Sequence, residues 1–359
     1  MRIAFLLPIY AIHPIGGIKI VLEYACRLTD HCFDVTVYYP MNVYSNKVTR
    51  WKYLKRLLGY LYLKITQGYK STKWFPLNRK VKEKLVWDLN QKRIATHDIY
   101  VATGVQTAYS LSEYKYIDLH KQIYLIQGFE NWIATDEYVL KSYRFPFKKI
   151  VISPWLQSLV LSQSTKENVV LIPNGFNQEV FNIQKEIFER NIYSICTIYH
   201  TDDVKRCVDA ISALIKLKEL FPQITVNMFG VPGRPPALPD WIKYYQKPNQ
   251  DELSKIYNDS SIYLAASRSE GMALPPAEAM LCGCALVCTN IGGFALYAIN
   301  NETSLTSEPY DVNGLVSSVS SLLLNPEKLY RIALAGNEKI KTFTWENSVK
   351  QFIQVVFSK

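Results

Sequence analysis

The first forty residues alternate between short apolar runs and a longer stretch in which apolar residues recur at helical spacing. Residues 3–7 and 35–39 are the short runs, and residues 18–28 have the helical spacing. A strand, a helix and a second strand in this order predict a βαβ unit, and therefore a parallel sheet with crossover helices. Residues 42–90 interrupt this pattern. Four further strands are predicted at residues 99–102, 122–126, 149–152 and 169–172.

A second series of the same kind begins after the turn at residues 173–175. Strands are predicted at residues 194–198, 225–229, 261–265 and 285–289, and helices at 204–217, 251–258, 275–281, from residue 325 and at 345–357. We therefore expect an α/β chain of two Rossmann-like, doubly wound domains facing each other across a cleft, with ligands at the carboxyl ends of the strands. The expected domains are residues 1–175 with a basic aromatic insertion at 42–90, residues 176–343, and a helix at 344–359 that returns to the first domain.

Candidate chemistry concentrates in residues 267–280, which read Ser-Arg-Ser-Glu-Gly-Met-Ala-Leu-Pro-Pro-Ala-Glu-Ala-Met. The segment links a predicted buried strand to a predicted helix whose start offers free N–H groups and a positive dipole to an anion. Gly271 lets the backbone approach a ligand closely. Glu278 can accept two hydrogen bonds from a ribose diol, and Glu270 can reach a bound sugar. A helix cap with a solvated acid is the structural alternative.

Two glutamates separated by seven residues, within Ser-x-x-Glu-Gly-x-x-Leu-Pro-x-x-Glu-Ala-Met, resemble the donor-site signature of the family 4 retaining glycosyltransferases, which have the GT-B fold. The resemblance implies that Glu270 contacts the transferred sugar and that Glu278 binds the nucleotide ribose. It also assigns donor contacts to the residues between them, Gly271, Met272, Ala273 and Leu274. The glycines of Ile291-Gly292-Gly293 match the family's next element, a loop that approaches the donor.

A second match is Tyr199-His200-Thr201-Asp202-Asp203-Val204-Lys205-Arg206. In the resembled family an arginine near the strand end and a Lys-Gly pair at the next helix hold the diphosphate. Lys205 fits the lysine, Arg206 stands where glycine is usual, and His200 lies near the position of the arginine. This departure leaves the second phosphate ligand open between Arg206 and Arg268. Fixed cations at this position would stabilise the charge of a leaving diphosphate, although Lys205 could also be a solvated helix lysine.

The first half carries weaker candidates. Gly16 and Gly17 resemble the family's glycine loop, which approaches the donor and the acceptor. Glu130 follows a predicted strand end and is a candidate for the catalytic base, while His13 is expected at the surface. The resemblance places nucleotide-base contacts around residues 245–247, with Gln246 as the named candidate.

The formal net charge is +10, and residues 47–84 account for all of it, because they contain twelve Lys or Arg and one acid, Glu83. Tryptophan, tyrosine and leucine are interleaved with these cations at helical spacing, which is typical of an interfacial element on anionic lipid. Nucleic acid attracts the same residue types, but the donor motifs favour a membrane and no nucleic-acid partner. A core-packing helix with a solvated basic face remains the alternative.

Several absences narrow the function classes. Seven scattered cysteines and five histidines form no metal pattern, and we read the cysteines as buried thiols. The sequence contains no Asp-x-Asp pair, no Gly-x-Gly-x-x-Gly and no P-loop. These absences argue against a manganese-dependent transferase, a nicotinamide dehydrogenase and a P-loop enzyme.

The resemblance, together with these absences, therefore implies a retaining, metal-independent transfer of a hexose or deoxyhexose from a nucleotide diphosphate sugar. The expected acceptor is a glycan or lipid-linked saccharide in bacterial surface polysaccharide or glycoconjugate synthesis, without a cofactor. The expected location is the cytoplasm. The basic aromatic segment adds the hypothesis of peripheral attachment to the inner face of the cell membrane. The alternatives are a catalytically silent GT-B binding subunit of a glycan assembly complex and a sugar-nucleotide epimerase. The nucleotide, sugar, linkage and oligomeric state stay open.

Overall fold

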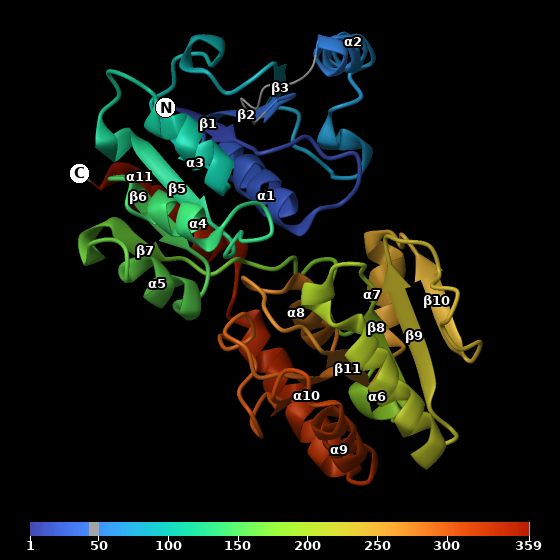
Figure 1. Cartoon of the computed structure of the whole chain (residues 1–359). Helices are drawn as coiled ribbons and strands as arrows, with labels where there is room; N and C mark the ends of the chain where they lie inside the picture. Colours follow the sequence, from blue (N-terminus) through green and yellow to red (C-terminus); the bar gives the residue numbers. More distant parts are fainter. Residues whose placement is uncertain (43–49, 359) are drawn as a thin grey trace. The chain divides into compact units, whose positions relative to one another are not determined.

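The computed structural model describes residues 1–42 and 50–358 and divides into two compact units (Figure 1). The first contains Met1–Ile152, Leu156–Ile172 and the residues from Ser348 on, and the second contains Ser153–Trp155 and Pro173–Asn347. The terminal helix thus groups with the first unit. In the described part of the chain, no helix is long and apolar enough to cross a membrane.

The first unit is built on a seven-stranded parallel sheet with the order β3-β2-β1-β4-β5-β6-β7. Its strands are β1 (Arg2–Leu6), β2 (Asp34–Pro40), β3 (Lys82–Val86), β4 (Ile99–Ala102), β5 (Gln122–Ile126), β6 (Lys148–Val151) and β7 (Val169–Leu171). Phe5 on β1 pairs in register with Val37 on β2 and Val101 on β4. The order reverses direction after β1, which makes the sheet doubly wound, as predicted.

Helices connect the strands of this unit: α1 (Gly16–Asp30), α2 (Arg50–Thr66), α3 (Val105–Ser112), α4 (Asp136–Tyr143), α5 (Pro154–Leu161) and, from the end of the chain, α11 (Trp345–Phe357). Phe352 on α11 is fully buried, and its ring centroid lies 6.1 Å from that of Phe5 and 5.1 Å from that of Tyr24. The end of the chain therefore completes the core around β1.

One strand lies inside the segment that the sequence analysis treated as an interruption. β3 pairs with β2 at the edge of the sheet, with Tyr39 opposite Leu85. Its sequence Lys-Glu-Lys-Leu-Val carries charge at the exposed positions, as sheet edges commonly do. The prediction of an insertion over all of 42–90 was therefore wrong for residues 82–86, because a half-charged edge strand lacks the apolar run used to find the others.

The second unit contains a six-stranded parallel sheet with the order β10-β9-β8-β11-β12-β13. Its strands are β8 (Ser194–Ile198), β9 (Thr225–Gly230), β10 (Ile242–Gln246), β11 (Ile262–Ala265), β12 (Ala285–Thr289) and β13 (Ser304–Ser307), and its helices are α6 (Cys207–Leu220), α7 (Gln250–Asn258), α8 (Leu274–Leu281), α9 (Val312–Leu323) and α10 (Pro326–Lys341). The four predicted strands are confirmed. Across both units, the described residues also form single turns of 3-10 helix: η1 (Ser71–Lys73), η2 (Gln91–Arg93), η3 (Leu119–Lys121) and η4 (Lys166–Asn168) in the first unit, and η5 (Ile187–Glu189) and η6 (Asp203–Lys205) in the second.

The two central strands of this sheet are β8 and β11, which run side by side while their connections leave in opposite directions. This reversal is the position at which open α/β sheets bind ligands. The strands are buried on both faces: Ile195, Ile262 and Leu264 share one face and are fully inaccessible, and so are Cys196 and Tyr263 on the other face. A rigid core therefore supports the loops that follow β8 and β11.

Candidate functional site

The loop that links β11 to α8 is held in place by three hydrogen bonds from other parts of the second unit, which includes Trp155 because the first two residues of α5 group with this unit. Thr289 Oγ1 donates to the Ser267 carbonyl. Trp155 Nε1 donates to the Gly271 carbonyl at 3.3 Å, and Tyr297 Oη donates to the Ala273 carbonyl at 2.9 Å. These bonds fix the backbone on both sides of Glu270, so the loop is positioned before any ligand binds.

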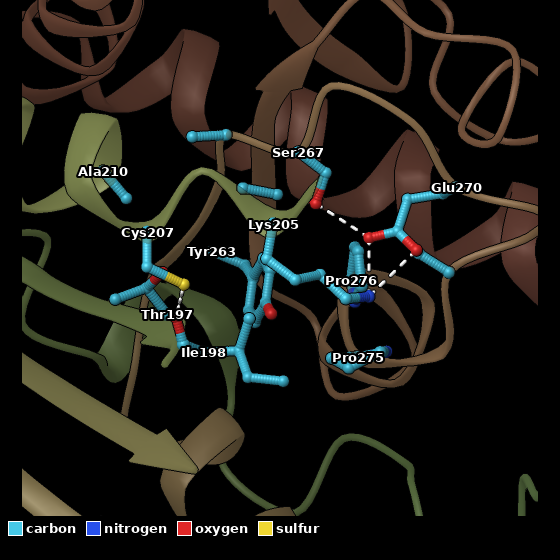
Figure 2. Close-up of a pocket in the computed structure, with 13 residues that line it drawn as sticks. Thr197, Ile198, Lys205, Cys207, Ala210, Tyr263, Ser267, Glu270, Pro275 and Pro276 are labelled. Atoms are coloured by element: carbon cyan, nitrogen blue, oxygen red, sulfur yellow. Dashed lines mark hydrogen bonds and ion pairs between the residues drawn. The ribbon is translucent and has the colours of Figure 1, made fainter. Parts of the chain in front are cut away.

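Glu270 and Lys205 form the centre of the site (Figure 2). Lys205 Nζ lies 2.7 Å from Oε1 and 2.9 Å from Oε2 of Glu270, and Ser267 Oγ donates to Oε1 at 2.7 Å. The two charged side chains are mostly buried, with 22% of Lys205 and 12% of Glu270 exposed. An ammonium group has three N–H donors, and two of them are directed at this carboxylate. A third donor is left for another acceptor.

These side chains line a pocket at the carboxyl ends of β8 and β11 (Figure 2). The pocket is formed by Thr197, Ile198, Lys205, Cys207, Ala210, Tyr263, Ala265, Ala266, Ser267, Glu270, Ala273, Pro275 and Pro276. Its walls are largely apolar, and the ion pair supplies its charge. Its enclosed space is only about 10 Å³, which is room for about one water molecule, so the pocket marks the position of the ion pair and is not a preformed cavity for a large ligand.

The start of α8 adds hydrogen-bond donors beside the ion pair. Pro275 and Pro276 occupy the first turn, where their missing N–H groups cost no intrahelical bond. Within the described residues, the backbone N–H groups of Met272, Ala273 and Leu274 make no hydrogen bond. Free N–H groups and the positive end of the helix dipole favour an anion at this position.

Glu278 lies in the second turn of α8, is 5% exposed and does not line the pocket. Tyr257 Oη donates to its Oε2 at 3.5 Å. Burial, and then the charge of Glu278, raise the pKa of Tyr257 well above its usual value, so the phenol stays protonated and can donate. The predicted ribose contact would therefore use a carboxylate that already has a buried tyrosine beside it.

The predicted helix over residues 204–217 begins later than the sequence suggests. Lys205 is the last residue of the turn η6, and α6 begins only at Cys207. Asp202 caps this turn, because its side chain accepts a hydrogen bond from the Val204 N–H at 3.0 Å. Arg206, between η6 and α6, has a φ of 48°. This left-handed conformation favours glycine, which accounts for the glycine usual at this position in the resembled family.

The guanidinium of Arg206 is engaged by its neighbours. It lies 2.8 Å from Asp209 Oδ2 and 2.7 Å from Asp203 Oδ1, and 4.9 Å from the ring of Tyr310. Arg268 is more open, because its side chain is 40% exposed and, within the described residues, its ion pair is a single contact with Asp203 at 3.4 Å. Of the two arginines considered for the second phosphate position, Arg268 has the greater free donor capacity.

His200 follows β8 and accepts a hydrogen bond from the Asp202 N–H on its Nδ1 at 3.0 Å. Burial, and then the charge of Lys205, lower the pKa of His200 below its usual value. The imidazole is therefore neutral at pH 7 and can donate from Nε2, but it does not replace the positive charge of an arginine.

The candidates in the first unit lie at its own strand ends. Gly16 and Gly17 form the first residues of α1 and not the end of a loop, and Gln127 Nε2 donates to the Gly17 carbonyl at 3.1 Å. Glu130 accepts a hydrogen bond from the Val105 N–H at the start of α3. Burial raises the pKa of Glu130 to about 7, and the Val105 N–H offsets part of this effect. A carboxyl group with this pKa can exchange a proton near neutral pH.

Replacing Glu130 with glutamine is expected to change how stability depends on pH. The pKa of Glu130 rises from 4.5 to about 7 on folding, so the folded protein binds the additional proton in this range. The free energy of unfolding of the wild type should then fall, relative to E130Q, as the pH rises from 4.5 to about 7. We expect the difference in unfolding free energy between the wild type and E130Q to change by about 2 kcal/mol over this range. This is less than the full pKa shift would give, because Glu130 is only half-buried and solvent screens its charge. Urea unfolding of both proteins at several pH values tests this, and parallel profiles would contradict the raised pKa.

Two further predicted positions are exposed. Gln246 ends β10, next to Lys247, whose N–H donates to the Gly230 carbonyl at 2.8 Å. His13 lies at the surface, as expected. Among the described residues, no group of three or more His, Cys, Asp or Glu side chains could hold a metal ion. Cys282, Cys284 and Cys288 are free and fully buried, as predicted.

Sequence reasoning missed the residues that support the site. Trp155 is separated from Gly271 by 116 positions, and no pattern in the sequence joins them. Ser267 stands in the recognised segment, and its spacing of three residues from Glu270 was a usable signal for a side-chain contact. Tyr257 lies on α7, where an aromatic residue at helical spacing resembles ordinary core packing.

Known proteins resemble this chain in sequence and in fold. Residues 183–339 match the family model of glycosyl transferases group 1. The chain is 24% identical over 343 residues to an uncharacterized glycosyltransferase of Methanocaldococcus jannaschii, covering 93% of this chain and 92% of that protein. It is 28% identical over 157 residues to a glycogen synthase of Mycobacterium tuberculosis, covering 41% of this chain but only 38% of the synthase.

Among solved structures, Anabaena Alr3699/HepE in complex with UDP superposes with a TM-score of 0.75 at 14% identity and covers 99% of both chains. At this identity the likeness concerns the fold, and it confirms the predicted GT-B architecture of two Rossmann-like domains. The match at residues 183–339 lies within the unit that carries the Lys205–Glu270 pair. The chain therefore has the GT-B fold, and residues 183–339 of its second unit resemble the glycosyl transferases group 1.

Proposed function

We propose that this protein transfers a hexose or deoxyhexose from a nucleotide diphosphate sugar to a glycan acceptor, with net retention at the anomeric carbon and without a metal ion. The observation that carries the proposal is the buried contact between Lys205 and Glu270 beside the free N–H groups at the start of α8. The diphosphate would accept hydrogen bonds from Lys205 and this helix start, while Glu270 would bind hydroxyl groups of the sugar. The HepE structure with UDP supports a nucleotide of this kind.

The proposed reaction is a displacement on one face of the sugar. The bond between the anomeric carbon and the β-phosphate oxygen breaks, and the departing diphosphate keeps the electron pair. The acceptor hydroxyl oxygen forms the new bond to the anomeric carbon, and its proton passes to the diphosphate. Lys205 would stabilise the charge that develops on the leaving group, which is where a fixed cation lowers the barrier most.

A donor screen tests the proposal directly. We expect UDP, GDP or dTDP sugars to raise the melting temperature selectively, and the best donor to be turned over with a glycan acceptor. The anomeric proton coupling in the NMR spectrum of the first product should match that of the donor, and turnover should persist in EDTA. An inverted product would contradict retention, and complete loss in EDTA that added Mg²⁺ or Mn²⁺ restores would contradict metal independence.

One observation favours a second candidate, a catalytically silent binding subunit. Arg206 occupies the position of the usual glycine and is held by Asp203 and Asp209, so the phosphate segment departs from the family pattern. A silent protein would bind nucleotide and show no turnover with any donor or acceptor. An epimerase, in contrast, would convert the donor in the absence of acceptor.

A further inference from the structure

Helix α2 carries an apolar face that is exposed in the structure. Exposed fractions on this face run from 46% at Leu54 to 82% at Ile65. The face consists of Trp51, Leu54, Leu58, Leu61, Tyr62 and Ile65. At about 100° per residue these six positions fall within an arc of about 100°, along a helix about 25 Å long. We call this set the α2 apolar stripe.

The opposite side of α2 attaches the helix to its unit. The rings of Tyr53 and Tyr60 meet Trp87 edge to face, with centroid distances of 5.3 and 5.6 Å. Arg56 Nη1 donates to Asn42 Oδ1 at 2.9 Å. A surface helix normally packs its apolar side inward. Here aromatic and polar contacts hold the inner side, and the α2 apolar stripe faces outward.

The cations of α2 are not balanced by acids. Residues 50–66 contain five Lys or Arg and no Asp or Glu. Lys55 Nζ lies 5.4 Å above the ring of Trp51, which places one cation beside the apolar stripe, and Lys64 Nζ lies 4.8 Å above the ring of Tyr60. Neither lysine forms an ion pair within residues 1–42 and 50–358.

We propose that α2 docks on an anionic lipid bilayer, with the α2 apolar stripe inserted at the level of the headgroups and the cations on the lipid phosphates. The α2 apolar stripe, with Lys55 beside it, matches this surface in both polarity and charge. Nucleic acid would pair with the cations and aromatic rings but leave Leu58 and Ile65 in water. A second copy of the chain would bring two α2 helices together, each with Lys55 and Lys64 and with no acid in residues 50–66 to pair with them. The sequence segment predicted for this role also includes residues 47–49, which lie outside the described residues.

Vesicle flotation tests this proposal without a donor or an acceptor, so its result does not depend on the proposed enzymatic function. Vesicles of phosphatidylcholine alone are compared with vesicles that also contain phosphatidylglycerol. We expect recovery of the wild type with anionic vesicles to be at least about tenfold higher than with neutral ones, and to fall as salt is raised. The double variant L58E/I65E should lose this recovery, and K55Q/K64Q should reduce it.

A matched control separates the stripe from a general effect of added charge. Leu334 on α10 is 53% exposed, similar to Leu58 at 59%, and L334E should float like the wild type. Circular dichroism of all variants should show unchanged helix content, since each substituted side chain is exposed. Equal recovery of L58E/I65E and the wild type would overturn the proposal. So would a dimeric wild type that L58E/I65E converts to a monomer, or binding of single-stranded DNA that is tighter than binding to anionic vesicles.

Discussion

Replacement of Lys205 by alanine should lower kcat/KM by about 10²- to 10³-fold, the cost typical of removing one fixed group that stabilises a transition-state charge. Lys205 Nζ lies 2.7 Å from Glu270 in a largely buried site, so the variant removes a cation that solvent does not readily replace. In the proposed reaction the charge on the diphosphate grows as the bond between the anomeric carbon and the phosphate oxygen breaks, so the loss should appear mainly in kcat. Steady-state kinetics with the best donor measures it.

Two comparisons sharpen this prediction. Lys216 on α6 is exposed and donates to Asn313 at 2.9 Å, so K216A should retain wild-type kinetics. Because Lys205 and Glu270 are hydrogen-bonded to each other, the double variant K205A/E270A should lose less than the product of the single losses. A K205A enzyme within threefold of the wild type would place the diphosphate elsewhere.

Replacement of Gly293 by alanine should lower kcat/KM by roughly 10²-fold, the size of loss expected when catalytic groups are displaced by about 1 Å. A Cβ atom at Gly293 would lie 2.4 Å from both Cβ and the carbonyl oxygen of Glu270. Neither atom is the end of a flexible side chain, so the loop that carries Glu270 must move and its contact with Lys205 must lengthen. Kinetics together with nucleotide titration calorimetry measures the effect.

The matched control is G233A. A Cβ atom at Gly233 would meet nothing within 4 Å, and this glycine lies in the proline-rich loop after β9. G233A should keep the activity of the wild type and its melting temperature. If G293A behaves like G233A, the loop after β12 tolerates the methyl group, and close packing against Glu270 is unnecessary for activity.

The parallel strands were predictable because buried strands leave short apolar runs bounded by turn residues. β13 (Ser304–Ser307) and α9 (Val312–Leu323) were missed, since serines replace many of the apolar residues that reveal an element. The charged edge strand β3 was missed for a related reason: only Leu85 and Val86 are buried within it. Local sequence therefore identifies central elements better than peripheral ones.

In the site, too, features that depend on neighbouring residues were predictable, and contacts between residues far apart in the sequence were not. The segment around Glu270 was found because its glycine and prolines have local backbone consequences. The ion pair with Lys205 spans 65 positions, and the sequence indicated the two residues separately but not their contact. The start of α6 was misplaced because the left-handed φ of Arg206 is unusual for a residue with a side chain. Apolar spacing alone carries no sign of such a conformation.

The path of the last helix has a practical consequence for dissecting the protein. The first unit is not one stretch of chain, since residues from Ser348 on rejoin it after the whole second unit. A fragment ending at Ile172 would lack Phe352 and leave its neighbours Phe5 and Tyr24 without their aromatic partner. Separate study of the two halves therefore calls for a circularly permuted gene, in which the terminal helix is encoded directly before β1.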